Sequence, residues 1–526
     1  MPISRVMFYT ICVSLGGFIF GFDASVISGA IQYIVEEFNL SPIELGFVVS
    51  APTLGATAAI LVAGPLADKF GRRNLLRVIA LLYLVSAVFS ALATSYWMLV
   101  IARFVGGLAF CSLMVAPMYI AEISPAAKRG KMVSVNQLNI VIGFSAAYFA
   151  NYYLFQASQI TSTFTEMIGL QDNIWRWMLG LEIIPAIIWL GLLYLIPKSP
   201  RWLLLKNNKD DAKHVLTTLR DKNSVAEIEL EIGQIEDSAK EKSTGLLTSL
   251  QSLFSSKLRL ALSIGLIVGI AQQITGINAI FFYAPSIFEQ SGVGTDAAFA
   301  QAIFVGLINV VFTVLAMYFI DKLGRKPLLI IGLAGVFVSM TLCSYGFNQA
   351  TYKLSAIDYQ QVVTAHSELP QAQLIDLRNV VDITFESDVV FKQQIKQYLD
   401  DNTYNKLQSE LLAVSTDMNA GLVLFGILAF VASFAFSLGP VMWVLFSEIF
   451  PNHLRGVAIS FVSVINSVVS FVVTLVFPIE LESLGASMTF LLYGLFALVS
   501  LIFVVKLFPE TKGKTLEQLE VEFNQG

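Results

Sequence analysis

Histidine and cysteine are scarce in this sequence, with three of each among 526 residues. The cysteines, Cys12, Cys111 and Cys343, all fall inside apolar segments. An odd, scattered set of this kind provides neither a disulfide framework nor the spacing of metal ligands. The sequence therefore predicts no metal site, and we expect the three thiols to fill the core.

Charge is also sparse. Asp, Glu, Lys and Arg make up 13% of the chain, and the net charge is −5. The basic residues that cluster form short loop motifs rather than a continuous face, so nucleic acid is not an expected partner. Hydrophobic residues account for 56% of the chain and the mean hydropathy is +0.71, which is outside the range of soluble globular domains. The lipid bilayer is therefore the expected solvent for most of the chain.

The chain contains many long apolar segments, which a soluble protein would lack. Twelve segments of about 20 residues, the length that crosses a bilayer core, begin near residues 6, 42, 74, 99, 131, 176, 258, 297, 327, 418, 456 and 486. Lys and Arg crowd the loops that follow even-numbered segments, whereas the short first, third and eleventh loops carry none. Because positively charged loops stay in the cytoplasm, both termini are predicted to be cytoplasmic.

An internal duplication divides these spans into two halves. Asp68-Lys69-Phe70-Gly71-Arg72-Arg73 returns as Asp321-Lys322-Leu323-Gly324-Arg325-Lys326. A glutamate seven residues before an Arg-Gly pair also occurs twice, as Glu122 and Glu448. Two homologous halves of six apolar spans are typical of transporters that rock about a central site. The predicted fold is an all-α membrane protein with two six-helix bundles.

The second half is longer than the first, and the excess can be located. Asp68 and Glu122 are 54 residues apart (122 − 68), whereas Asp321 and Glu448 are 127 apart (448 − 321). The extra residues form a polar outward-facing insertion, predicted over 349–417, which we expect to be a solvated cap of short helices; a substrate-collecting or partner-binding role is the alternative. The other predicted units are bundles 1–197 and 258–509, cytoplasmic linker helices over 198–257, and a cytoplasmic tail over 510–526.

Several motifs, in this order and spacing, resemble those of a known family. They are Gly21-Phe22-Asp23-Ala24-Ser25-Val26-Ile27-Ser28-Gly29, Arg103-Phe104-Val105-Gly106-Gly107, Pro117-Met118-Tyr119-Ile120-Ala121-Glu122, Trp175-Arg176-Trp177, Ser199-Pro200-Arg201-Trp202-Leu203, Gln272-Gln273-Ile274-Thr275-Gly276-Ile277-Asn278, Gly439-Pro440-Val441-Met442-Trp443 and Pro509-Glu510-Thr511-Lys512-Gly513. Over nearly its whole length the chain resembles the sugar porters of the major facilitator superfamily. Its pattern is most similar to that of bacterial proton-linked xylose and hexose symporters.

Asp23 is the first candidate for proton coupling. A charged side chain deep in a membrane span is costly unless it is paired or hydrated, and Arg103 in the fourth span is the expected partner. His214, His366 and His453 all lie in loops, so a carboxylate must carry any transported proton. Burial favours the neutral acid and the arginine favours the carboxylate, so a conformational change can load or release the proton. The resemblance implies that this Asp–Arg pair couples transport to protons.

Two alternatives remain for these charges. Asp23 and Arg103 could form a static buried ion pair with no role in coupling. Glu182, in the outer part of the sixth span, is a second candidate for the proton site. A hydrated, purely structural role near the outer surface is equally compatible with its position.

A neutral sugar needs hydrogen-bond donors and acceptors for its hydroxyls and a flat apolar surface for its C–H face. Amides and aromatic rings of the inner spans supply both, although an isolated amide in a membrane helix is more often an interhelical contact. The resemblance places the matching positions around the sugar. The candidate residues are Gln137, Gln272, Gln273, Asn278, Asn309, Phe434, Trp443 and Asn466.

Departures from the family pattern alter the predicted edge of the pocket. Phe144 stands where the xylose symporter has a further Gln, Phe282 replaces one of its paired Tyr residues, and Ser467 stands where Trp is frequent. A hexose, a pentose or a cyclic polyol all remain possible, because one hydroxyl or methylene is discriminated by pocket detail.

The duplicated charges at the cytoplasmic span ends have a mechanical interpretation. They are predicted to form ion pairs that hold the two halves together below, which the resemblance associates with the outward-facing state; a topology-setting role is the alternative. Lys198 stands where the family usually has Glu, which puts one pair in doubt. The predicted gate residues are Asp68, Arg72, Glu122, Arg129, Arg325, Glu448, Arg455 and Glu510.

These features predict a secondary transporter that imports a monosaccharide or related polyol with a proton. An uncoupled uniporter has the same site, and a sugar sensor would normally need a signalling tail longer than the dozen or so residues after Gly513. No phosphate-binding Gly-rich loop or nucleophile elbow occurs, so neither an enzyme nor a cofactor is predicted. We expect a monomer with sugar, proton and lipid as partners, and short termini with only one weak outward-facing glycosylation motif favour a bacterial inner membrane.

Overall fold

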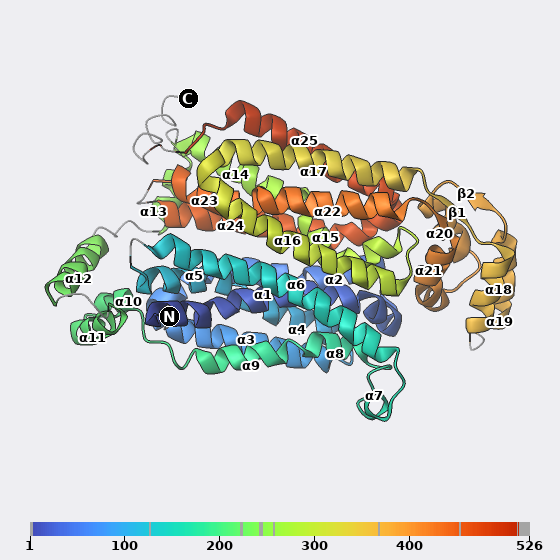
Figure 1. Ribbon diagram of the computed structural model, residues 1–526, viewed down its shortest axis with the longest axis horizontal. Helices are drawn as coiled ribbons and strands as arrows, with labels where there is room; N and C mark the ends of the chain where they lie inside the picture. The colour runs from blue at the N-terminus through green and yellow to red at the C-terminus, as the bar shows by residue number, and fades with distance from the viewer. Residues whose placement is uncertain are drawn as a thin grey trace.

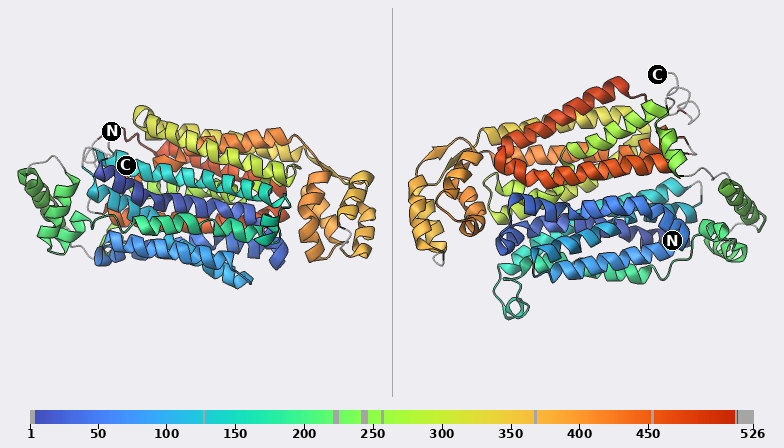
Figure 2. Two further views of the ribbon diagram at one scale, coloured as in Figure 1. Left: turned by 60° about the horizontal axis from the view of Figure 1, so that its bottom comes forward. Right: turned by 180° about the vertical axis from the view of Figure 1, so that it is seen from behind.

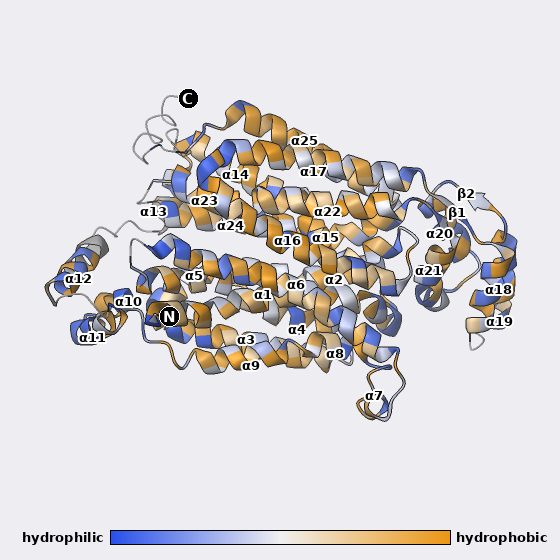
Figure 3. Cartoon of the chain, in the orientation of Figure 1, coloured by the Kyte–Doolittle hydropathy of each residue, from blue (hydrophilic) through white to orange (hydrophobic). Residues whose placement is uncertain are grey.

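Residues 4–125, 128–220, 225–240, 246–255, 258–366, 369–451, 454–512 and 514 are described by a computed structural model. Twelve helical segments within them are long and apolar enough to cross a membrane. Each begins within three residues of its predicted start, and Figure 3 shows apolar residues dominating the long helices while polar residues gather toward their ends and in the insertion. The predicted twelve-span membrane fold is confirmed.

The first six spans form the N-terminal half. Two of them, the fourth and the sixth, are each built from two helices in sequence, α4 with α5 and α8 with α9. The helices of this half are α1 (Arg5–Phe38), α2 (Pro42–Phe70), α3 (Arg72–Ala91), α4 (Tyr96–Ala109), α5 (Ser112–Ile123), α6 (Arg129–Ser158), α7 (Thr163–Met167), α8 (Ile174–Gly180) and α9 (Ile183–Leu192).

Amphipathic helices join the halves at the end of the molecule where the N-terminus lies (Figure 1). The sequence predicts helices over 210–220 and 225–235, and the structure contains both, the second of them longer. The linker helices are α10 (Pro200–Leu205), α11 (Lys209–Leu219), α12 (Val225–Lys240) and α13 (Leu246–Leu253).

The C-terminal half repeats the arrangement with six further spans. Its seventh and tenth spans are again broken, into α14 with α15 and α22 with α23. The spanning helices are α14 (Arg259–Ile274), α15 (Ile277–Glu289), α16 (Thr295–Leu323), α17 (Arg325–Asn348), α22 (Ala420–Phe436), α23 (Leu438–Ile449), α24 (Arg455–Ser483) and α25 (Gly485–Leu507).

The insertion between α17 and α22 lies at the opposite end of the molecule from the linker helices (Figures 1 and 2). Its short helices are as predicted, but it also contains a three-stranded antiparallel sheet in the order β2-β1-β3, which the prediction missed. The elements are β1 (Thr351–Lys353), α18 (Ala356–Ala365), α19 (Gln371–Asp376), the 3-10 helix η3 (Leu377–Val380), β2 (Thr384–Phe385), α20 (Asp388–Lys396), α21 (Asp401–Ser415) and β3 (Thr416–Asp417).

The two halves pack against each other through three pairs of long helices, α1 with α15, α2 with α24, and α6 with α16. Their contacts include aromatic side chains from both halves. The rings of Phe155 and Phe299 stack with centroids 4.9 Å apart, and those of Phe144 and Phe281 lie 4.7 Å apart. The Tyr148 hydroxyl donates to the Phe281 carbonyl oxygen at 2.7 Å. These contacts join the bundles on the side of the insertion.

Candidate substrate and proton site

Breaks in two spans of the C-terminal half position the predicted amides. Gly276 separates α14 from α15 and has φ +86°, a left-handed conformation that glycine adopts without penalty. The glycine within this apolar span predicts a helix break, and the structure confirms it. Gln272 and Gln273 therefore occupy the last turn of α14, and Asn278 occupies the first turn of α15.

Four of the predicted amides form one hydrogen-bonded cluster. Asn278 Nδ2 donates to Gln273 Oε1 at 2.9 Å, and Gln273 Nε2 donates to Asn466 Oδ1 at 3.2 Å. Asn466 Nδ2 donates to Gln272 Oε1 at 3.0 Å and to the Gly269 carbonyl oxygen at 2.7 Å. Gln272, Gln273 and Asn466 are each no more than 8% exposed. The amides thus satisfy one another in an otherwise apolar interior, as buried polar groups must.

The cluster can exchange partners with a sugar hydroxyl. Asn278 is half-buried, and its Oδ1 accepts no hydrogen bond within the described residues. An amide presents both donors and acceptors, so a neighbouring hydroxyl can replace an amide–amide bond without leaving a buried group unpaired. Chemically, the arrangement suits a neutral polyol better than an ion, because no charged side chain belongs to the hydrogen-bonded cluster as described.

The remaining predicted sugar residues stand apart from this hydrogen-bonded cluster. Asn309 is buried on α16 and Gln137 is half-buried on α6, and neither side chain makes a hydrogen bond to another described residue. Phe434 is buried near the end of α22, whereas Trp443 on α23 is 45% exposed. The helix-breaking pair Gly439-Pro440 predicts a break in this span, and the structure places the break between α22 and α23 at Ser437, two residues earlier.

The N-terminal half contains a buried cluster of charges. Arg103 on α4 forms an ion pair and hydrogen bond with Asp23 on α1, and Arg103 Nη2 also donates to the Asp23 carbonyl oxygen at 3.4 Å. The two side chains are 2% and 1% exposed. A carboxylate and a guanidinium compensate each other's charge at such a site, where neither would be stable alone.

Glu182 belongs to the same cluster. It lies at the break between α8 and α9, is 2% exposed, and interacts directly with Asp23 and electrostatically with Arg103. This burial differs from the hydrated position considered for Glu182, and its role in coupling stays a prediction. Asp23 Oδ2 and Glu182 Oε1 are both buried without a hydrogen-bond partner among the described residues. Two carboxyl groups thus share one arginine.

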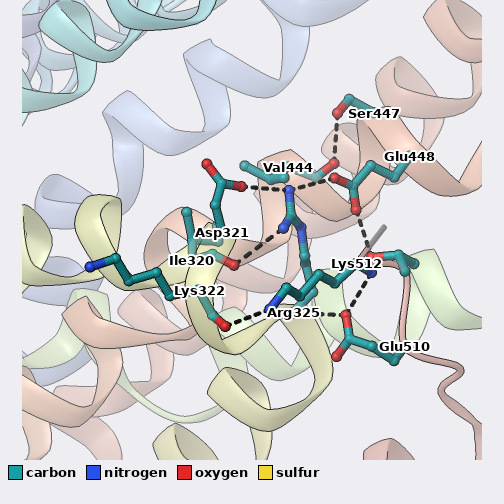
Figure 4. A network of polar contacts seen from close by, with 10 residues as sticks. Ile320, Asp321, Lys322, Arg325, Val444, Ser447, Glu448, Glu510 and Lys512 are labelled. Carbon is teal, nitrogen blue, oxygen red and sulfur yellow. Dashed lines mark hydrogen bonds and ion pairs between the residues drawn. The ribbon is translucent and has the colours of Figure 1, made fainter. Parts of the chain in front are cut away.

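The predicted gate charges of the C-terminal half form a network at the ends of α16, α17 and α23 (Figure 4). Arg325 pairs with Asp321 at 3.1 Å and with Glu448 at 2.8 Å. Glu510 accepts the backbone N–H groups of Arg325, Lys326 and Lys512 at 2.8–3.1 Å. A carboxylate in this position satisfies the unpaired donors at the start of α17.

The N-terminal half repeats the ion pairs of this network, with Lys198 in the place of Glu510. Arg72 pairs with Asp68 at 2.9 Å and with Glu122 at 3.0 Å. Ser199 donates to Glu122, and at the equivalent point Thr511 donates to Glu448 at 2.7 Å.

All these pairs lie within one half, which differs from the predicted arrangement. Arg129 donates to the Ala121 carbonyl oxygen at 3.1 Å and Arg455 to the Phe450 carbonyl oxygen at 3.2 Å, so both bind backbone rather than a carboxylate. Within the part of the chain that the structure describes, no ion pair joins the two halves at this end. The charges brace each bundle internally in the conformation described.

Comparison with known proteins identifies the family. The model of the family described as "Sugar (and other) transporter" matches residues 9–363 and 407–523. The chain belongs to this sugar transporter family. The arabinose-proton symporter of Bacillus subtilis is 33% identical over 99% of this chain and 97% of its own, and the D-xylose transporter of Levilactobacillus brevis is 34% identical over 96% and 93%.

A solved structure of a relative has the same fold. A partially occluded, inward-open structure of the xylose transporter XylE from Escherichia coli superposes with a TM-score of 0.72 at 28% identity, over 97% of this chain and 99% of that chain. The chain is therefore a multi-pass membrane protein of the twelve-helix major facilitator fold.

The two halves of the protein differ at Lys198, the counterpart of Glu510. In the C-terminal half, Glu510 occupies the space in front of Gly324, where a side chain on the glycine would meet its carboxylate. In the N-terminal half, the Trp202 ring occupies the same place in front of Gly71. Lys198 lies 5.9 Å from the centroid of that ring. The start of α3 is therefore covered by an indole, where the start of α17 is covered by a carboxylate.

Sequence reasoning missed Ser470, which takes part in the amide cluster of this transporter. Asn278 Nδ2 donates to Ser470 Oγ at 2.6 Å. Ser463, Asn466, Ser470 and Thr474 are all buried and follow one face of α24. Their spacing of three to four residues is a helical polar stripe, so the periodicity of this span contained a usable signal.

Proposed function

We propose that this sugar transporter imports a monosaccharide together with a proton by alternating access. The observation that carries the proposal is a pair of buried polar clusters, one in each half, inside an apolar interior. The amides of the C-terminal half can bind a neutral polyol, and the charges of the N-terminal half can hold a proton. Coupling requires only that one conformational change alters both environments.

A pentose or a hexose is the proposed substrate. A cyclic polyol is the alternative, because its hydroxyls can form the same hydrogen bonds with the amides. Arabinose and xylose are named for two relatives that cover nearly all of this chain. Phe144 and Phe282 are buried and apolar at two of the positions where the family pattern differs. An apolar ring in place of an amide removes a hydrogen-bond partner for one hydroxyl, so the preference among sugars need not follow that of any relative.

The proton is proposed to reside on the carboxyl pair Asp23 and Glu182. Only Arg103 is positioned to balance their charge within the described residues. Two ionised carboxylates beside one arginine would leave a buried negative charge, which is costly. A proton on one carboxyl removes that charge and gives the unpartnered Asp23 Oδ2 and Glu182 Oε1 a shared hydrogen bond.

The conformation described fits a step of this cycle in which the outer side is closed. Aromatic contacts join the halves on the side of the insertion, and the charges at the other end pair within each half. The inward-open XylE structure supports the same interpretation. We further propose that the protein lies in a bacterial inner membrane with both termini in the cytoplasm, because the basic loops favour that orientation.

Uptake into liposomes tests the proposal. Purified protein is reconstituted, and radiolabelled arabinose, xylose, glucose and inositol are offered with and without an inward pH gradient. Accumulation above equilibrium that a protonophore collapses is expected for at least one of them. Equilibration without accumulation would instead establish an uncoupled uniporter, and no uptake of any sugar would refute monosaccharide transport.

A further inference from the structure

The insertion is a small folded unit with its own core. Buried side chains from β1, α18, α19, η3, α20 and α21 form a separate hydrophobic cluster that includes Tyr352, Leu374, Phe391 and Leu407. The family model leaves out residues 364–406, which make up the middle of this unit. Family membership therefore implies no role for this unit.

Polar contacts fasten the insertion to the C-terminal half, from which it emerges. Lys392 Nζ donates to Gln290 Oε1 at 2.8 Å, and Lys396 pairs with Glu482. Ser409 Oγ donates at 3.3 Å to Glu289 Oε2, a buried acid at the end of α15. With three attachments on α20 and α21, the insertion is expected to move as one body with this half.

The same helix, α21, also reaches the N-terminal half. It packs against α1, and Asn405 Nδ2 donates to Asn39 Oδ1 at 2.7 Å. Lys406 lies near Glu36 on α1 and interacts with it electrostatically, as does His366. Asn39 ends α1 in the left-handed conformation, with φ 48° and ψ 54°, which asparagine tolerates better than most residues.

The contact with the N-terminal half is small and partly open to solvent. A cavity of about 750 Å³ lies beside it and is lined from both sides, by Tyr33, Glu36 and Trp175 of the N-terminal half and by Asn402 and Lys406 of α21. Exposed polar pairs contribute little individually. Such an interface can be broken and remade repeatedly, unlike the core of the insertion.

We propose that α21 is an outer clasp, which holds the two halves together on the side of the insertion and must release α1 before that side can open. The clasp is fixed to one half and bonded reversibly to the other, so it favours the conformation that is closed at this side. The inference rests on the alternating-access part of the proposed function.

Distances across the outer face test the clasp without any transported sugar. Ile160 and Leu484 are exposed, at the ends of α6 and α24, and can carry spin labels as cysteines, because the native Cys12, Cys111 and Cys343 are buried. Asn405→Ala should raise the population with long distances at least threefold. Lys353→Ala, which removes an exposed ion pair with Asp382 inside the insertion and no contact of α21, is the matched control and should leave it unchanged. An unchanged distribution in Asn405→Ala, or equal shifts in both variants, would overturn the proposal.

A locked clasp supplies the complementary measurement. Glu36→Cys with Lys406→Cys places one thiol on each side of the contact. A short bifunctional reagent that reacts with both thiols can join them without the close approach that a disulfide requires, and a reducing agent cleaves the reagent. Cross-linking should slow sugar exchange at least tenfold, with recovery on reduction. The pair Lys396→Cys with Glu482→Cys, cross-linked within one half, should retain its rate. Undiminished exchange by the cross-linked Glu36–Lys406 pair would overturn the clasp. Absence of exchange in the reduced protein would instead count against the proposed function. In that case the distance measurement alone would test the clasp.

Discussion

Asp23 on α1 and Arg103 on α4 form an ion pair in which neither side chain is more than 2% exposed, and the carboxyl of Glu182 adjoins it. Three ionisable groups with one positive charge thus meet in the interior of the N-terminal half. Removing any one of them changes how many protons the other two must hold. The first two predictions follow from this relationship.

Replacing Asp23 by Asn should abolish sugar accumulation against a gradient and preserve exchange. The amide keeps the shape of the side chain but cannot release a proton, so the accumulation ratio should fall to about 1 while exchange stays within about threefold of the parent. Vesicles with an imposed pH gradient provide the measurement. Glu37→Gln is a matched control on the same helix, since Glu37 also pairs with an arginine, Arg176, at 2.6 Å. Loss of neither activity in Asp23→Asn would remove the coupling assignment.

Replacing Arg103 by Gln should destabilise the protein, because both carboxyls then lose the one cation that pairs with them among the described residues. Breaking a buried ion pair from one side typically costs about 3–5 kcal/mol. The melting temperature in detergent should fall, and it should recover in part in the double variant Asp23→Asn/Arg103→Gln. The loss should also be smaller at acid pH, where the carboxyls can bind protons. A double variant less stable than Arg103→Gln would contradict the compensation.

Replacing Asn278 by Ala should weaken sugar binding selectively. It removes a half-buried amide from the cluster with Gln273 and Ser470, and one lost hydrogen bond at a binding site is worth roughly 1–3 kcal/mol, or about 5- to 150-fold in affinity. The KM for uptake should rise with little change in maximal rate. Asn139→Ala is the control and should leave KM unchanged, because Asn139 on α6 donates to Ser14 Oγ on α1 at 2.7 Å, in the N-terminal half. Equal effects of both substitutions would show that the amides act through folding alone.

Replacing Glu448 by Gln should shift the resting population toward the inward-facing state. The substitution removes one of the two carboxylates that pair with Arg325, and with it a charge predicted to stabilise the outward-facing state. The measurement is the labelling rate of a cysteine placed in the outer cavity, which should fall severalfold. Glu122→Gln makes the same change in the other half. Unchanged accessibility in both variants would count against a gating role for these duplicated charges.

Glu510 and Lys198 should differ in their effect on stability although they occupy duplicated positions. Glu510 accepts three backbone N–H groups near the start of α17, so Glu510→Ala should cost about 1 kcal/mol, as expected for a lost helix cap. Lys198→Ala removes only a cation near the Trp202 ring and should be close to neutral. Thermal denaturation in detergent compares the two. Equal losses would contradict the asymmetry between the halves.

The architecture was largely predictable from sequence because its causes are local. Lipid selects apolar segments of one length, and basic residues mark one side of the membrane, so twelve spans and the place of the insertion follow from composition along the chain. The duplicated Asp68 and Asp321 motifs revealed the two halves. Gly276 indicated a helix break, because a residue without a side chain adopts left-handed backbone conformations at little cost. The pairing of Asp23 with Arg103 was also expected, since a lone buried charge is unstable.

Tertiary structure decided which distant side chains meet. The rotation and register of α8 and α9 bring Glu182 beside Asp23, and those of α24 bring Ser470 to Asn278; neither contact is encoded in spacing along the chain. The gate charges pair within each half because the relative position of the two halves decides which charged side chains lie close enough to pair. The sequence motif does not contain that information. The strands of the insertion are two or three residues long, too short for a periodic signal, and they form only because a surrounding core holds them together.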